Sequence, residues 1–233
     1  MTQMRPTYPA SAMIGQRRLD ELDVLLVRRH VFPEGLTSAD DAEVLLSIHR
    51  SASETTPDWD AWFVEAMVAF IVFHSWPQYS LDEFNANWIV ALIAPDGKVA
   101  TPAELEFLLH AIEVSRSVPD LLSALAIDQL RIAVEGEGGA LSSMRRSKRP
   151  GISREDVDYL YRILKGSYGG GRMRLTGREY AVIASIERRV RSYFNHPAWH
   201  DLMRSLEQVD DAGLRNASGW LQSFESVEES CVA

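Results

Sequence analysis

The sequence has little cysteine and no long apolar run. Its 233 residues include one cysteine, Cys231, so no disulfide within the chain can stabilise the fold. The longest apolar stretch, 62–73, is interrupted by Glu65, which argues against a membrane-spanning helix. The first 18 residues contain arginines but no apolar segment of signal-peptide length. We therefore expect a globular cytoplasmic protein with no membrane partner.

Signatures of catalysis are also missing. The sequence has no Gly-x-Ser-x-Gly motif, and the glycines at 169–171 are not followed by the Gly-Lys-Ser/Thr of a phosphate-binding loop. His196 and His200 have a spacing that can bind a metal, but Pro197 between them is expected to begin a helix and to leave His196 outside it. We therefore expect no catalytic residue, no cofactor and no enzymatic activity.

Charge is distributed unevenly along the chain. Residues 141–204 contain 14 lysines and arginines against 6 aspartates and glutamates, a balance of +8. The rest of the chain has a balance of −17, so the net charge is −9. One interpretation is that the basic segment 145–191 binds nucleic acid through Arg145, Arg146, Lys148, Arg149, Arg172 and Arg174. The other is that acidic parts of the same chain, or of a second copy, neutralise it.

Hydrophobic residues recur mainly at helical spacing. Leu105, Leu108, Leu109 and Ile112 follow the i, i+3, i+4, i+7 pattern of a helix with one apolar face. The segment 57–75 is apolar nearly all round, which indicates a central buried helix. The sequence therefore predicts an all-α bundle of about nine or ten helices, at 18–30, 38–50, 57–75, 81–94, 102–116, 119–135, 153–165, 177–194, 198–206 and 211–224.

Several helix starts are marked by a hydroxyl residue three positions before an acid. The two side chains of such a pair can satisfy the free amide groups of the first helical turn. Five pairs have this spacing: Thr37 with Asp40, Ser80 with Glu83, Thr101 with Glu104, Ser153 with Asp156, and Thr176 with Glu179.

A segment rich in glycine and serine, 136–150, is the best candidate for a linker. It would separate a helical subdomain at 1–135 from a basic subdomain with an acidic tail at 151–233. The two parts also resemble each other, because 35–40 is similar to 151–156 and 97–104 is similar to 171–179. Duplication and repeated use of the same helix-capping chemistry both explain the similarity.

The turn at Asp96 and Gly97 resembles part of a calcium-binding loop, with Glu104 downstream. The oxygen ligands that such a loop needs before its glycine are missing, and Glu104 comes one residue late, so an ordinary EF-hand is excluded. We expect a turn between helices. Metal binding by clustered carboxylates that include Asp96 and Glu104 is the alternative.

Aromatic residues stand between two expected helices at 76–79. Trp76 and Tyr79 flank Pro77 and Gln78, and such an aromatic corner, if exposed, would suit a protein partner.

The run Asp96-Gly97-Lys98-Val99 followed by Glu104 resembles the Asp-Gly-x-hydrophobic-x-x-x-x-Glu signature of the tellurite-resistance TerB-like helical family. The helix starts near 35–37 and 57–59 are similar to uncharacterised bacterial proteins grouped near that family, chiefly from alphaproteobacteria. The resemblance covers about 35–130 and less of 150–205. It implies a helical bundle linked to stress responses, in some members with an acidic surface suspected of binding metal, and it implies no enzymatic activity. Gly170 replaces the acid before Gly171, which removes a second acidic site.

From these observations we expect a non-catalytic cytoplasmic scaffold or stress-associated interaction module. Its partner would be another protein or a second copy of the chain. A nucleic-acid-associated regulator and a carboxylate metal-binding protein are the alternatives.

Overall fold

The structure is a computed structural model that describes residues 8–147, 149–169 and 172–208. The chain divides into two compact units, residues 1–78 (unit 1) and 79–233 (unit 2). The described residues form eleven α-helices, nine of them with seven or more residues, and the structure is 67% helix and 4% strand. The predicted all-α class is confirmed.

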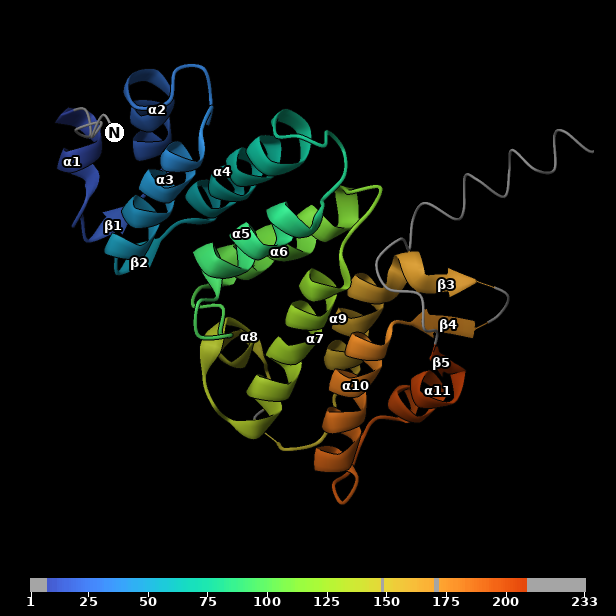
Figure 1. The fold of residues 1–233 in the computed structure, drawn as a ribbon. Helices are drawn as coiled ribbons and strands as arrows, with labels where there is room; N and C mark the ends of the chain where they lie inside the picture. Colours follow the sequence, from blue (N-terminus) through green and yellow to red (C-terminus); the bar gives the residue numbers. More distant parts are fainter. Residues whose placement is uncertain (1–7, 148, 170–171, 209–233) are drawn as a thin grey trace, which may run out of the picture. The chain divides into compact units, whose positions relative to one another are not determined.

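Unit 1 consists of four α-helices, a π-helix and two very short parallel strands within its described residues. In chain order these are α1 (Tyr8–Met13), β1 (Arg18–Leu19), α2 (Glu21–His30), α3 (Ala39–Ser51), β2 (Glu54–Thr55), α4 (Pro57–Val68) and the π-helix Ala69–His74 (Figure 1).

The core of unit 1 is built around α4, as the apolar character of 57–75 predicts. Trp59, Phe63 and Met67 are completely buried. The indole of Trp59 donates a hydrogen bond of 3.2 Å to Nδ1 of His49, and the His49 ring stacks on Phe63. A buried polar pair of this kind costs little because both groups are satisfied. By contrast, Glu65, the acidic residue that interrupts this apolar segment, is exposed on α4.

Unit 2 contains the other helices and a small three-stranded sheet. In chain order its elements are α5 (Glu83–Ile93), α6 (Pro102–Val114), α7 (Asp120–Glu135), α8 (Gly139–Met144), α9 (Arg154–Leu164), the 3-10 turn Lys165–Ser167, β3 (Tyr168–Gly169), β4 (Arg172–Leu175), α10 (Gly177–Val190), α11 (Pro197–Ser205) and β5 (Leu206–Gln208). Strand β4 is central, antiparallel to β3 and parallel to β5.

The central element of unit 2 is α7, which packs against α5, α6, α8, α9 and α10 (Figure 1). Its buried positions include the small residues Ala124, Ala126 and Ala133, which let neighbouring helices approach closely, between larger residues such as Leu122 and Leu130. Sequence periodicity did not distinguish this helix from the amphipathic helices around it.

Three of the five predicted helix caps are found where the sequence places them, at Thr101, Ser153 and Thr176. The other two are displaced. Helix α3 is capped by Ser38 with Asp41, because the Asp41 carboxylate accepts hydrogen bonds from the amides of both Thr37 and Ser38.

The cap of α5 also differs from the prediction. Asp82 caps this helix together with Asn85, in place of Ser80 with Glu83. The amide of Leu81 donates to the carbonyl of Ser117, which keeps the chain extended at this point and delays the start of the helix.

The chain divides at Gln78–Tyr79, whereas the linker predicted at 136–150 contains helix α8. Ala140 and Leu141 of α8 are buried, and α8 packs on α6 and α7. Glycine and serine also occur in short packed helices such as α8. The composition of 136–150 therefore could not show whether this segment is a linker or a helix. The short strands were not predicted, and the helix predicted at 211–224 lies outside the described residues.

Candidate functional site

The turn at Asp96 and Gly97 is held by a buried glutamine of α7. Gln129 accepts a hydrogen bond from the amide of Val99 at 2.9 Å and donates to the carbonyl of Gly97 at 2.9 Å. Asp96 accepts the amide of Lys98 at 3.1 Å, and Gly97 has φ 82°, a conformation that favours glycine. These bonds give Asp96 and Gly97 a structural role in the turn.

The two weak metal candidates lie in different surroundings. Asp96 is exposed, whereas Glu104 is completely buried in the first turn of α6, where its amide donates to the Thr101 hydroxyl. In the part of the chain that the structure describes, no group of three or more His, Cys, Asp or Glu residues is placed to hold a metal ion.

The similar segment near 176 also buries a glutamate behind a threonine cap. Glu179 is completely buried and accepts hydrogen bonds from the Thr176 amide at 2.9 Å, from the Thr176 hydroxyl at 3.0 Å and from the Ser123 hydroxyl of α7. The cap therefore also joins α10 to α7. The segments near 101 and 176 thus share a threonine-capped helix start with a buried glutamate three residues after the threonine, and in α10 the glutamate side chain completes the cap.

The predicted nucleic-acid residues do not all reach the surface. Arg145 is buried in an ion pair with Asp156, whereas Arg146, Arg149 and Arg174 are exposed. Lys148 and the side chain of Arg172 lie outside the described part of the structure.

Several exposed cations and aromatic rings near the end of α10 were not predicted from the sequence. Arg188 lies in the last turn of α10, which ends at Val190. Arg191, Tyr193 and Phe194 follow the helix, and Tyr193 and Phe194 are 48% and 87% exposed. We call Arg149, Arg188, Arg191, Tyr193 and Phe194 the basic-aromatic surface. The sequence contains this signal, because Tyr193 and Phe194 come within three residues after Arg191.

Hydrogen bonds join the two segments that form this surface. The side chain of Asn195 accepts the amide of Ile152 at 2.9 Å, and the amide of His196 donates to the carbonyl of Ile152 at 2.9 Å. Gly151 lies so close to the carbonyl of Phe194 that a Cβ there would be 2.0 Å from its oxygen. The chain two residues after Arg149 is therefore held against the loop that carries Phe194.

His196 has a structural role at the start of α11. It lies outside the helix, as Pro197 predicts, and its Nδ1 accepts the amide of Ala198 at 3.2 Å. His200 is exposed on the same helix.

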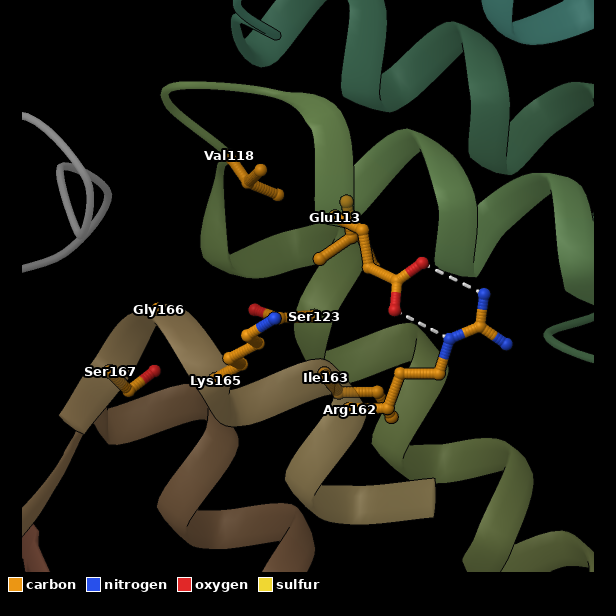
Figure 2. A pocket seen from close by; sticks show the side chains of 9 residues that line it. Glu113, Val118, Ser123, Arg162, Ile163, Lys165, Gly166 and Ser167 are labelled. Atoms are coloured by element: carbon orange, nitrogen blue, oxygen red, sulfur yellow. Dashed lines mark hydrogen bonds and ion pairs between the residues drawn. The ribbon is translucent and has the colours of Figure 1, made fainter. Parts of the chain in front are cut away.

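A cavity of about 260 Å³ opens in unit 2 between α6, α7 and α9 (Figure 2). Ile112, Val118 and Ile163 form its apolar lining. Its polar lining is largely engaged within the protein, because Arg162 binds Glu113 at 2.7 and 2.8 Å and also binds Glu106, and the Ser123 hydroxyl donates to Glu179. Among the charged residues of the lining, Lys165 is the one for which no ion pair is seen in the described structure. The cavity therefore has few polar groups that are free to bind a ligand.

The two residues of the predicted aromatic corner are both exposed. Trp76, near the end of unit 1, is 85% exposed, and Tyr79, at the start of unit 2, is about half exposed. The guanidinium of Arg116 lies 5.2 Å from the centre of the Tyr79 ring, within the range of a cation–π interaction.

A row of leucines faces solvent on α2. Leu22, Leu25 and Leu26 are 69%, 56% and 49% exposed, whereas Val24 and Val27 on the opposite face belong to the core of unit 1. We call these three leucines the α2 leucine face. Apolar residues at the i, i+3, i+4 positions of an exposed helix face are typical of a surface that packs against another helix.

Comparison with known proteins adds no assignment. No protein-family model, curated protein or solved structure matches the chain. Among the described residues, no helix combines the length and the apolar character needed to cross a membrane.

Proposed function

We propose that the protein is a non-catalytic interaction module that pairs with a second copy of itself through α2. The observation that carries this proposal is the α2 leucine face. This ten-residue helix exposes three large apolar side chains to solvent. Burying them would stabilise the protein by about 25 cal/mol for each Å² of apolar surface removed from water. Packing against a second helix buries them.

The charges along α2 favour a second copy as the occupant. The helix begins with Glu21 and Asp23 and ends with Arg28, Arg29 and His30. If two copies of α2 pack antiparallel, the acidic start of each helix lies beside the basic end of the other. Such a pair has two-fold symmetry and uses the same surface on both chains, as in most homodimers.

The pairing should be weak. One helix face of this length buries less than the roughly 1,200 Å² that is typical of stable complexes. We expect a dimer that forms at micromolar or higher protein concentration and dissociates on dilution.

Sedimentation equilibrium of the full chain tests the proposal. We expect Leu25→Glu to remain monomeric at concentrations at which the wild-type chain forms dimers. Phe84→Ser is the matched control, because Phe84 is also strongly exposed but lies on α5 of unit 2, and this variant should dimerise like the wild type. A monomeric wild-type chain, or equal dimerisation of Leu25→Glu, would refute the proposal.

The other predicted functions have less support. Nucleic-acid binding loses Arg145 to an internal ion pair, and metal binding has Asp96 and Glu104 engaged at a turn and a helix start. The TerB-like resemblance, the stress-associated role and the cytoplasmic location stay predictions, and self-pairing is compatible with each of them.

A further inference from the structure

The basic-aromatic surface of unit 2 has an excess of positive charge. Among the described residues, Arg149, Arg188 and Arg191 make no ion pair with an acidic side chain. Arg189 differs from them, because its Nε lies 3.9 Å from Glu135 of α7. Unpaired cations concentrated on one surface attract an acidic segment and raise its rate of association.

The same surface also offers apolar contact. Phe194 is almost fully exposed at the tip of the loop after α10, and Tyr193 is half exposed beside it. Aromatic side chains provide much of the binding energy in protein interfaces, and arginine is the cation most often found with them. The occupant should therefore carry both acidic and large apolar residues.

The end of this chain has that composition. Residues 209–233 contain five acidic residues and one arginine, a balance of −4, and their large apolar residues include Trp220, Leu221 and Phe224. Nearly half of the net charge of −9 is therefore in the last 25 residues, which begin five residues after the end of the basic segment 141–204.

The connection is long enough for this segment to reach the surface. Gln208 pairs with Leu175, and Leu175 lies two residues before the start of α10. The basic-aromatic surface lies at the other end of α10, about 21 Å away for 14 residues at 1.5 Å each. Twenty-five extended residues can span up to about 80 Å.

We infer that residues 209–233 bind the basic-aromatic surface of the same chain, with the acidic side chains at Arg149, Arg188 and Arg191 and apolar side chains at Tyr193 and Phe194. Because both partners belong to one chain, the effective concentration is in the millimolar range, so a weak contact suffices. This inference is independent of pairing through α2. Nucleic acid is a poorer occupant, because the chain as a whole carries a net charge of −9 and repels polyanions.

Cys231 allows a direct test in the full chain, because it is the chain's only cysteine. A nitroxide spin label on Cys231 should broaden the backbone amide NMR signals of 188–194 relative to the reduced label. The Leu25→Glu background removes any contribution from pairing through α2, so failure of that proposal does not affect this result. We expect the double variant Arg188→Gln and Arg191→Gln to restore most of the lost signal, and 1 M salt to do the same.

Arg154→Gln is the control, because Arg154 is exposed and in an i, i+4 ion pair with Asp158, so this variant should retain the broadening. The inference is overturned if the broadening is absent, maps to other residues or persists in the double variant. It is also overturned if the broadening appears only between separately labelled chains, which would place the tail on a second copy. Binding of a single-stranded oligonucleotide at 188–194 without any tail contact would identify nucleic acid as the occupant instead.

Discussion

Arg145 and Asp156 form a buried ion pair with two contacts, from Nε to Oδ1 at 2.9 Å and from Nη2 to Oδ2 at 2.7 Å. Their side chains are only 6% and 3% exposed. Asp156 also accepts the amide of Ser153 at the start of α9, and Arg145 also donates to the carbonyl of Gly151. The pair therefore fixes the segment between α8 and α9, which composition indicated as a linker.

Loss of this arginine should destabilise the fold. Arg145→Met leaves the Asp156 carboxylate buried without its charged partner, and we expect the free energy of unfolding to fall by about 3–5 kcal/mol. Arg146→Met is the control, since the neighbouring Arg146 is exposed and should change stability by less than about 0.5 kcal/mol. Urea denaturation of both variants measures the difference. Equal stability of the two would contradict the structural role of Arg145.

Gln129 should be essential to the turn at Asp96 and Gly97. Gln129→Leu removes the partners of the Val99 amide and the Gly97 carbonyl, and we expect a loss on the order of 2 kcal/mol in the free energy of unfolding. Lys98→Met breaks the exposed ion pair with the Glu137 carboxylate and the exposed hydrogen bond to the Glu137 carbonyl, so it should cost about 1 kcal/mol or less. Thermal or urea unfolding can rank the two. If Lys98→Met were the more damaging variant, the surface ion pair would hold the turn.

Stability should depend on Glu113 in acid. Hydrogen bonds from Arg162, supported by its charge, hold the pKa of Glu113 below its ordinary value of 4.5. A lowered pKa in the folded state contributes stability that is fully present above the ordinary pKa of 4.5, and this contribution is lost as the pH falls below that value and through the lower folded pKa. Arg162→Gln should raise the pKa of Glu113 and reduce this acid-dependent loss.

The check is an NMR titration of the Glu113 carboxyl together with urea denaturation at pH 6 and pH 3. Arg154→Gln serves as the reference, because it removes an exposed arginine of the same helix that contacts Asp158. An unchanged Glu113 titration in Arg162→Gln would show that another group controls this carboxyl.

The helices could be predicted because their signals are local. Apolar spacing and caps within three or four residues located α6, α9 and α10 to within a few residues. The caps of α3 and α5 were predicted at the wrong residues, because several neighbouring side chains could accept hydrogen bonds from the free amides of the first turn. In α5 this choice depends on Ser117, which is distant in sequence.

The binding surfaces could be predicted only in part, because exposure depends on tertiary packing. Trp76 and Tyr79 are each exposed, and their role in binding a partner stays a prediction. Arg145 has the same local sequence context as Arg146, and only its contact with Asp156, eleven residues away, distinguishes them. The α2 leucine face was missed for the same reason, since a helical apolar pattern does not show which of its two sides meets the core.

Site-directed disulfide crosslinking tests self-pairing through α2 most directly. In a Cys231→Ser background, an antiparallel pair centred between Leu25 and Leu26 places Leu22 of one copy beside Arg29 of the other. Mixing Leu22→Cys with Arg29→Cys under mild oxidation should therefore give mainly the mixed dimer, and Phe84→Cys should remain monomeric. Absence of the mixed dimer, or a preference for Leu22→Cys and Arg29→Cys each to pair with itself, would contradict the account.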